Sequence, residues 1–233
     1  MQQTPLPLGN TLEPSCRFAN FIVGRNLQLM QRLQQTSPPP LLYLWGGDGL
    51  GKSHLLQSIC HAQSDQGGVA FYLPLALLKD EDPSLLTGMG EANLIALDDL
   101  DSVAGRADWE EAIFHLLNQL RLQGGRGVVA ARHAPQALPL QLPDLSSRLQ
   151  WGEVYSLQPL NDAEKHRLLQ DRARSYGIHL SDALVNYLMQ RLTREVGPLM
   201  RLLEDLDYAS LAAKQRVTIP FVRQWLQQQN RLV

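Results

Sequence analysis

Residues 46–53 combine glycines, a lysine and a hydroxyl group in an order suited to holding phosphate groups. The order is Gly-Gly-Asp-Gly-Leu-Gly-Lys-Ser, which matches the phosphate-binding P-loop pattern in full. Glycines allow backbone N–H groups to curl around a phosphate, and the N-terminus of a following helix adds partial positive charge. In such a loop Lys52 would reach the β- and γ-phosphates, and the Ser53 hydroxyl would bind Mg²⁺. The residues expected to contact a nucleotide here are Gly47, Asp48, Gly49, Leu50, Gly51, Lys52, Ser53 and His54.

Two adjacent acids, Asp98 and Asp99, follow the apolar segment 94–97, which has the form of a buried strand. After a P-loop, such acids have known chemistry: Asp98 would hold Mg²⁺ through water, and Asp99 would orient the attacking water. The alternative is that the two acids only end a strand. Because a P-loop lies upstream, the catalytic interpretation is favoured, with Ser53 and Asp98 as the metal-binding pair.

Two departures from an active hydrolase are visible around these acids. The tip of the neighbouring strand, residues 128–132, carries alanines where a Ser, Thr or Asn would assist hydrolysis. Asp99 is also one methylene shorter than the Glu that is usual at its position. The sequence therefore predicts nucleotide binding with weak or no ATP hydrolysis by the chain alone.

Arg148 lies in the segment Ser-Ser-Arg-Leu-Gln-Trp, just before an expected strand. Its position alone suggests an exposed arginine with a solvated surface role. In multimeric P-loop ATPases, however, an arginine at this place points toward a neighbour's γ-phosphate and contributes about 10³–10⁵ in rate. Arg148 is therefore a candidate catalytic residue that acts in trans.

The first 15 residues are rich in proline and lack helical periodicity, so an extended tail is expected there. A short peptide with Gln3, Leu6 and Leu8 could place both leucines in an apolar pocket while hydrogen bonds hold the Gln3 amide. Burial of two leucines contributes roughly 3–6 kcal/mol before ordering costs, which corresponds to micromolar affinity. The alternative is a leader whose leucines are incidental. The residues alone favour the two interpretations about equally.

Apolar segments then alternate with helical periodicity, which predicts an α/β fold with a parallel sheet and right-handed crossovers. Strands are expected at residues 41–45, 69–73, 94–97, 127–131 and 154–157, and helices at 27–33, 54–63 and 109–122. The expected domains are a tail (1–15), a nucleotide-binding α/β domain (16–159) and a helical lid (160–233).

Strand signals largely stop after residue 159, and helix-start signals follow. Asn161 with Glu164 forms a capping-box pattern that opens a helix to about residue 176. Ser181 can cap the next helix, to residue 192, and Pro198 and Pro220 fit the first turns of two more. The sequence thus predicts a small lid of four helices.

Composition describes an ordinary globular chain of 233 residues with 44% hydrophobic residues and a formal net charge of −2. This slightly negative charge argues against a stand-alone DNA-binding protein, which usually displays a basic face. No apolar segment is long enough to span a bilayer, and the two cysteines, Cys16 and Cys60, have neither a disulfide framework nor zinc spacing. A cytoplasmic location is the expectation.

Together, the segment 18–24, the P-loop, the acid pair, Arg148 and the C-terminal helices resemble the AAA+ module of the replication initiator DnaA. The resemblance covers nearly the whole chain and stops where an initiator would continue into its DNA-binding domain. A short DnaA-like module with a Gln-x-x-Leu-Pro-Leu tail is similar to the Hda family, which acts in regulatory inactivation of DnaA.

The resemblance implies a function as well as a fold. Members of this family bind ADP, attach to the DNA-loaded sliding clamp (the beta subunit of DNA polymerase III) and stimulate ATP hydrolysis by DnaA, which lowers initiator activity. By position, Gln3, Leu6 and Leu8 would bind the clamp, and Arg148 would act on DnaA-bound ATP. The residues expected near the base are Phe21, Ile22, Val23 and Gly24. Self-association as a dimer and little or no sequence-specific DNA binding are further expectations.

One position departs from the family pattern. An arginine that contacts the phosphates is usual at the start of the third lid helix, and this chain has Gly197 there. Arg194 and Arg201 lie close by, and the sequence leaves open which of them replaces it; Arg201 is included among the candidate nucleotide ligands. The expected consequence is looser sensing of the γ-phosphate, which favours stable diphosphate binding.

Two other interpretations stay open. The first is an autonomous AAA+ ATPase that acts as a replication loader or motor. A basic DNA-facing stripe and an intact hydrolysis site would support it, and neither is evident in the sequence. The second is a nucleotide-gated partner of another protein, with the same fold but no involvement of DnaA.

Overall fold

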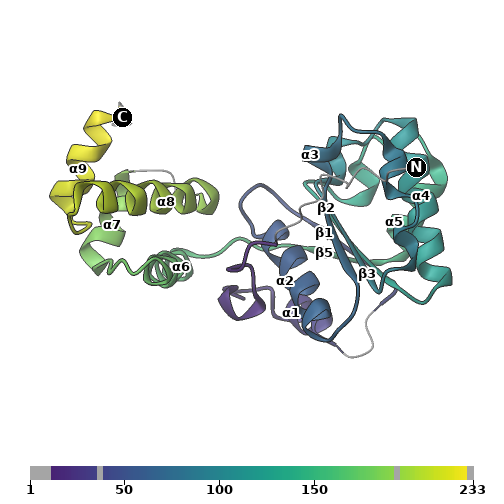
Figure 1. The fold of residues 1–233 in the computed structure, drawn as a ribbon, viewed down its shortest axis with the longest axis horizontal. Coiled ribbons are helices and arrows are strands. Elements are labelled where there is room, and N and C mark those ends of the chain that lie inside the picture. Colours follow the sequence, from purple (N-terminus) through teal and green to yellow (C-terminus); the bar gives the residue numbers. More distant parts are fainter. Residues whose placement is uncertain (1–11, 36–38, 192–194, 230–233) are drawn as a thin grey trace, which may run out of the picture. The chain divides into compact units, whose positions relative to one another are not determined.

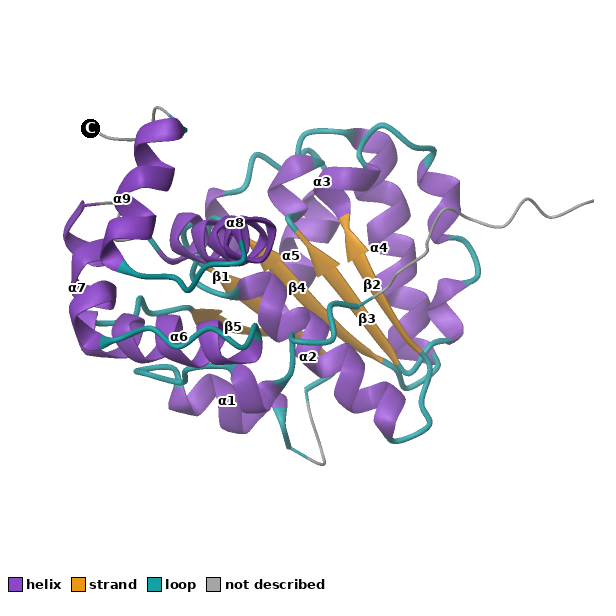
Figure 2. Ribbon diagram, turned by 60° about the vertical axis from the view of Figure 1, so that its left-hand side comes forward, coloured by secondary structure: helices purple, strands orange, loops and turns teal. Residues whose placement is uncertain are grey.

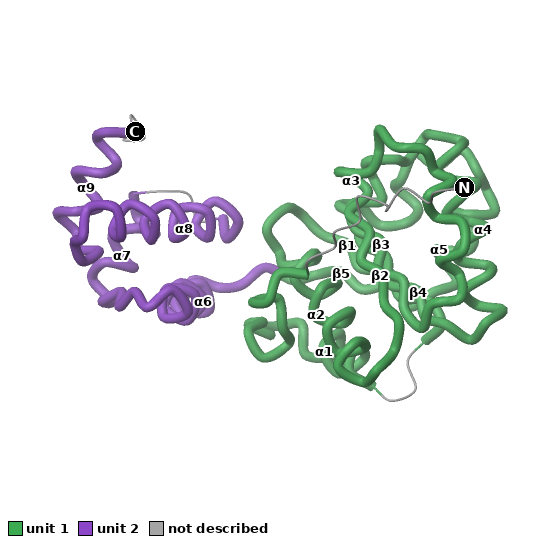
Figure 3. Tube along the Cα trace, in the orientation of Figure 1, with its two compact units in different colours: residues 1–158 green, residues 159–233 purple. Residues whose placement is uncertain are grey.

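The structure is a computed structural model, and it describes residues 12–35, 39–191 and 195–229. The chain divides into two compact units, residues 1–158 and 159–233 (Figure 3), one residue before the expected boundary. The predicted tail residues Gln3, Leu6 and Leu8 lie outside the described residues, as does Arg194.

The first unit is built on a parallel sheet of five strands in the order β2-β3-β4-β1-β5 (Figure 2). The strands are β1 (Leu41–Trp45), β2 (Ala70–Pro74), β3 (Leu94–Asp98), β4 (Arg126–Ala131) and β5 (Glu153–Ser156). Each strand begins and ends within one residue of its expected range, so the predicted parallel α/β sheet is confirmed.

Helices cover both faces of this sheet (Figure 1). They are α1 (Leu27–Leu33), α2 (Lys52–Asp65), α3 (Leu75–Leu78), α4 (Ala107–Leu122) and α5 (Pro143–Trp151). Short 3₁₀ helices lie at Phe18–Asn20, Pro83–Leu86, Met89–Glu91, Leu100–Ser102 and Pro135–Ala137. Helices α3 and α5 were not expected: α3 has only four residues, and α5 follows a loop that contains several prolines.

Alternating side chains of the strands build the two halves of the core, as the pleat of a strand requires. In β1, Tyr43 packs with the buried residues of α4 and α5, whereas Leu42 and Leu44 pack with those of α1 and α2. Cys60 on α2 is buried in the second cluster, where burial raises the pKa of its thiol to about 12. Its role is therefore in packing.

The second unit is a bundle of helices α6 (Asp162–Ser175), α7 (Asp182–Arg191), α8 (Val196–Ala213) and α9 (Ile219–Gln228). The predicted capping box is present: the Asn161 side chain accepts from Glu164 N at 2.9 Å, and Glu164 Oε2 accepts from Asn161 N at 2.7 Å. Pro198 and Pro220 lie in the first turns of α8 and α9, as expected. None of the described helices combines the length and the apolar character needed to cross a membrane.

Candidate nucleotide site and arginine surface

The predicted phosphate and metal residues meet at one edge of the sheet because parallel strands end together there. Strand β1 leads into the P-loop, and its last residue Trp45 is in register with Ala131, the last residue of β4. Strand β3, next to β4, ends at Asp98. In open α/β sheets ligands bind in the crevice at the carboxyl ends of the strands.

The P-loop has the backbone geometry that its glycines allow. Gly49 and Gly51 have φ angles of 72° and 94°, a region that favours glycine. Gly51 caps the N-terminus of α2, and a Cβ atom at this position would lie 2.8 Å from Phe21 Cε2. At Gly47 a Cβ atom would meet nothing within 4 Å. The loop thus combines a helix N-terminus with open space, which fits a bound phosphate.

Lys52, the first residue of α2, is buried, and its ammonium turns into the loop. Its Nζ donates hydrogen bonds to Gly46 O at 2.8 Å and to Gly47 O at 2.9 Å. The cation is therefore held beside the same loop whose N–H groups are expected to face the phosphates.

Tyr72 on β2 joins the two predicted metal-binding residues. Its hydroxyl donates to Asp98 Oδ2 at 2.8 Å and also hydrogen-bonds with the Ser53 side chain. Asp98 is only 1% exposed. Burial, and then the Asp98 carboxylate, raise the pKa of Tyr72, so the phenol stays neutral and able to donate.

A magnesium ion in a P-loop site takes a hydroxyl, a carboxylate, waters and phosphate oxygens rather than a cage of protein ligands. Within the described ranges, no group of three or more His, Cys, Asp or Glu side chains could hold a metal ion. The donor set of Ser53 and Asp98 therefore suits Mg²⁺ that arrives with a nucleotide.

Asp99 has the left-handed backbone conformation, with φ of 53°, which Asp tolerates better than most residues. Its N–H donates to Asp98 Oδ1 at 3.0 Å. Burial, followed by the neighbouring carboxylates of Asp98 and Asp101, raises the pKa of Asp99. The strand end thus holds the second acid in a fixed and electrostatically unfavourable place.

The segment 21–24 lies against the start of α2. The Phe21 ring is 5.7 Å from the ring of His54, and it closes over Gly51. His54 Nε2 lies 3.0 Å from Arg17 O, which ties the N-terminal segment to the same helix. The structure therefore brings Phe21, one of the expected base-side residues, to the P-loop within the first unit.

Arg148 is half-buried on α5, between the buried residues Leu145 and Leu149. Its Nη2 donates to Oδ1 of Asn118 on α4, and its Cζ lies 6.0 Å from the centroid of the Trp151 ring. Trp151 itself is 76% exposed. The guanidinium is thus held along the surface of α4 and α5 and is not sequestered in the core.

A buried acid fixes the chain that leads into α5. Glu110 is 0% exposed, and Gly105 N donates to its Oε1 at 2.6 Å. Its Oε2 accepts from Gln141 N at 2.8 Å and Leu142 N at 2.7 Å. Since α5 begins at Pro143, this carboxylate positions the helix that carries Arg148.

The lid residues Gly197 and Arg201 belong to the second unit. Helix α8 begins at Val196, so Gly197 lies in its first turn and Arg201 lies in its second turn. Arg201 is exposed and lines a shallow hollow with Pro198 and Asp205, among others.

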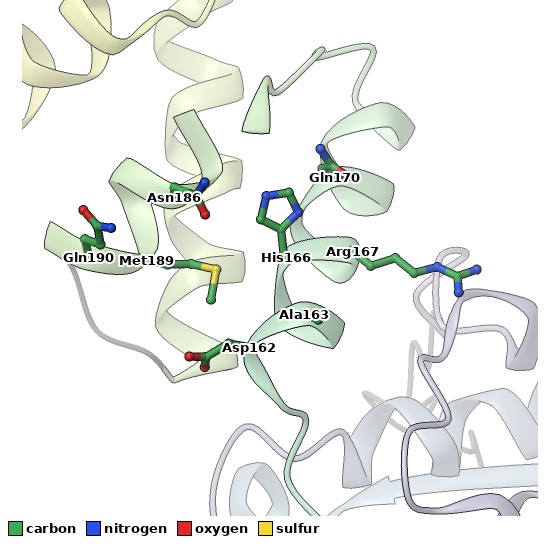
Figure 4. A pocket seen from close by; sticks show the side chains of 8 residues that line it. All are labelled: Asp162, Ala163, His166, Arg167, Gln170, Asn186, Met189 and Gln190. Carbon is green, nitrogen blue, oxygen red and sulfur yellow. The ribbon is translucent and has the colours of Figure 1, made fainter. Parts of the chain in front are cut away.

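A second cavity, of about 470 Å³, opens between α6 and α7 (Figure 4). His166 and Met189 point into it, whereas Arg167 points away. This cavity has neither a P-loop nor a glycine turn among its lining residues, so it lacks the phosphate chemistry of the first unit.

Sequence reasoning did not single out Tyr72, Glu110 or Asn118. Each acts on a residue 26 or more positions away, and only the pairing of strands and helices brings them together. The sequence pattern also gives Arg132 no role, although this residue directly follows β4 at the expected nucleotide edge.

Comparison with known proteins identifies both the lid and the fold. The family model of the Hda lid domain matches residues 162–226. Domain III of the replication initiation protein DnaA from Thermotoga maritima superposes with a TM-score of 0.80 at 22% identity, over 93% of this chain and 97% of that chain. Residues 162–226 thus match the Hda lid domain, and the chain has the fold of DnaA domain III.

Other solved structures share this fold with the chain. AMPPCP-bound DnaA from Aquifex aeolicus has a TM-score of 0.67 at 23% identity, over 83% of this chain and 66% of that chain. The RuvB Holliday junction branch migration motor from Thermotoga maritima has a TM-score of 0.61 at 17% identity, over 87% and 67%.

Proposed function

We propose that this Hda-like chain is a regulatory adaptor of replication initiation. It holds a nucleotide, ADP, in its P-loop, attaches to the sliding clamp through Gln3, Leu6 and Leu8, and uses Arg148 to stimulate ATP hydrolysis by DnaA. The observation that carries the proposal is the position of Arg148, which is fixed on a helix surface at a distance from its own P-loop.

The topology of the parallel sheet supports an action of Arg148 on another molecule. The P-loop follows the carboxyl end of β1, whereas α5 leads into the amino end of β5, whose Glu153 is in register with Leu42 near the start of β1. Arg148 lies about one helical turn before that edge. Its own nucleotide would bind at the opposite edge of the sheet, which supports an action of the guanidinium on a partner.

Two features of the guanidinium support a catalytic role in trans. Asn118 accepts one of its N–H groups, which restricts a long side chain and lowers the entropy lost on docking. The planar fork keeps further N–H donors for phosphate oxygens. An arginine so placed stabilises transition-state charge on a transferring phosphoryl group, with an effect of about 10³–10⁵ on rate.

The nucleotide held by the chain itself has a structural role in this proposal. Lys52 and the α2 N-terminus would bind its phosphates, and Ser53 with Asp98 would hold Mg²⁺, which supplies positive charge to the phosphate oxygens. The alanines at the end of β4 and the short Asp99 side chain support slow turnover. AMPPCP is bound in the DnaA structure from Aquifex aeolicus, which has the same fold.

The decisive experiment mixes the chain with ATP-bound DnaA, clamp and DNA and follows phosphate release. Arg148→Ala should lower the stimulation by about 10³ or more, and Arg148→Lys should restore little of it because the planar fork is lost. Arg121→Ala, an exposed arginine on α4, is the matched control and should act like the wild type. Unchanged stimulation by Arg148→Ala would refute the catalytic assignment.

The tail and the oligomer are tested separately. Gln3→Ala or Leu6→Ala should weaken capture by immobilised clamp while nucleotide binding stays unchanged, and an unaltered capture would refute the tail assignment. Sedimentation of the nucleotide-bound chain should show the proposed dimer. Steady-state ATP hydrolysis by the chain alone at the rate of an active motor would favour the autonomous ATPase instead.

A further inference from the structure

Arg132 ties the P-loop to the neighbouring strand. It directly follows β4, and its Nε lies 3.0 Å from Asp48 Oδ1 in the P-loop. The same Nε lies 3.6 Å from Asp101 Oδ2, and the backbone N–H of Arg132 donates to Asp101 Oδ1 at 2.8 Å. The backbone at Arg132 is thus anchored, while its side chain reaches across to the loop.

Asp48 is an unusual partner because it places a carboxylate in a loop that is built for anions. Backbone N–H groups and Lys52 make the loop attractive to phosphate, whereas a negative side chain opposes each added phosphate charge. The guanidinium of Arg132 offsets the negative charge of the Asp48 carboxylate while the two side chains are paired. Without the arginine, the loop would carry an uncompensated acid beside its ligand.

The carboxylate of Asp48 is easily replaced by another anion as the partner of Arg132. The two side chains are 72% and 54% exposed, and exposed ion pairs are weak. Arginine–phosphate contacts are charge-assisted and often bidentate, so they are stronger than an exposed pair with a carboxylate. A phosphate group at this edge therefore competes well for the guanidinium.

We propose that Arg132 is a specificity-determining nucleotide ligand that leaves Asp48 to bind the γ-phosphate of a bound triphosphate. Asp101 holds its backbone during the exchange, and Asp48 opposes a third phosphate. The Asp48–Arg132 pair then sets the preference between diphosphate and triphosphate. The inference rests on the proposed nucleotide function of the P-loop and adds the group that discriminates between the two ligands.

The test measures dissociation constants of Mg-ADP and Mg-ATP for the purified full chain by calorimetry. Arg132→Gln should weaken ATP binding about tenfold and ADP binding less than about threefold. Asp48→Asn removes the opposing charge and should strengthen ATP binding about threefold relative to ADP. Arg121→Gln on the exposed side of α4 is the matched control and should leave both constants unchanged.

Each outcome decides the inference. Equal losses for ADP and ATP in Arg132→Gln, or no loss, would overturn it, because the arginine would then be only a structural tie. If Arg132→Gln does not fold, as judged by circular dichroism, Asp48→Asn decides alone, and an unchanged ATP-to-ADP ratio overturns the inference. Failure of the wild type to bind either nucleotide is a different result, which refutes the proposed nucleotide function itself.

Discussion

Replacement of the buried Glu110 should destabilise the first unit and release the segment that leads to α5. The carboxylate accepts three backbone N–H groups, from Gly105, Gln141 and Leu142. In Glu110→Gln one carboxylate oxygen becomes an NH₂ group, which cannot accept a hydrogen bond. At least one buried N–H donor then loses its acceptor and faces a second donor.

The expected loss follows from that count. A hydrogen bond to a charged group contributes about 1.5–3 kcal/mol, so Glu110→Gln should lower the free energy of unfolding by about that amount. For a chain of this size, 1 kcal/mol shifts Tm by about 2–4 °C, which gives a decrease of about 3–12 °C. Glu110→Ala leaves all three donors without an acceptor and should cost about 4 kcal/mol or more.

Urea unfolding followed by circular dichroism measures the loss, and hydrogen exchange of the Gln141 and Leu142 amides locates it. Glu111→Gln is the matched control, because Glu111 is one residue away and exposed, and it should change stability by less than about 0.5 kcal/mol. If Glu110→Gln unfolds at the same urea concentration as the control, the carboxylate does not anchor this loop, and the reasoning is wrong.

Three further changes have expected outcomes. Asp99→Asn keeps a residue that tolerates positive φ and removes a carboxylate whose pKa is raised in the fold. The protonated form of Asp99 favours folding below its ordinary pKa of about 3.9, and this contribution is lost as the pH rises through the higher folded value. The variant should therefore gain a few tenths to about 1 kcal/mol at pH 7, and the gain should shrink toward pH 4 in urea titrations. Gly51→Ala, which places Cβ against Phe21, should cost about 1–3 kcal/mol and abolish most nucleotide binding in calorimetry. Asn161→Ala should cost about 0.5–2 kcal/mol of lid stability and leave nucleotide affinity unchanged; an equal loss in both assays would contradict separate roles.

Local patterns predicted the strands and the lid helices because their causes are local. The apolar run of β1 and the capping box at Asn161 depend on neighbours within four residues, and the structure contains both. Helix α5 was missed for a physical reason: its fixed point is the Glu110 carboxylate, which lies 31 residues before Gln141. A helix whose start is set by a distant acid leaves little trace in its own sequence.

The candidate site likewise has parts that depend on local sequence and parts that depend on distant contacts. The P-loop and the acid pair are contiguous motifs, so their chemistry could be predicted directly. The contact of Arg132 with Asp48 depends on the sheet order, which places β4 beside β1 although β2 and β3 lie between them in the chain. The sequence alone showed Arg132 only as the residue after two alanines, because strand order in a doubly wound sheet is not written in any one strand.

The parallel sheet also separates the two chemical groups on which the proposed function depends. Strand β1 has five residues, and at about 3.3 Å per residue the two edges of the sheet are roughly 16 Å apart there. The P-loop follows one edge, and Arg148 lies near the other. This separation argues that Arg148 does not act on the nucleotide proposed for its own P-loop. Nucleotide binding and activation of a partner should therefore respond to different substitutions, and Arg148→Ala should leave the ADP dissociation constant within about twofold of the wild-type value. A coupled loss of both would show that the two edges communicate and would contradict this geometric argument.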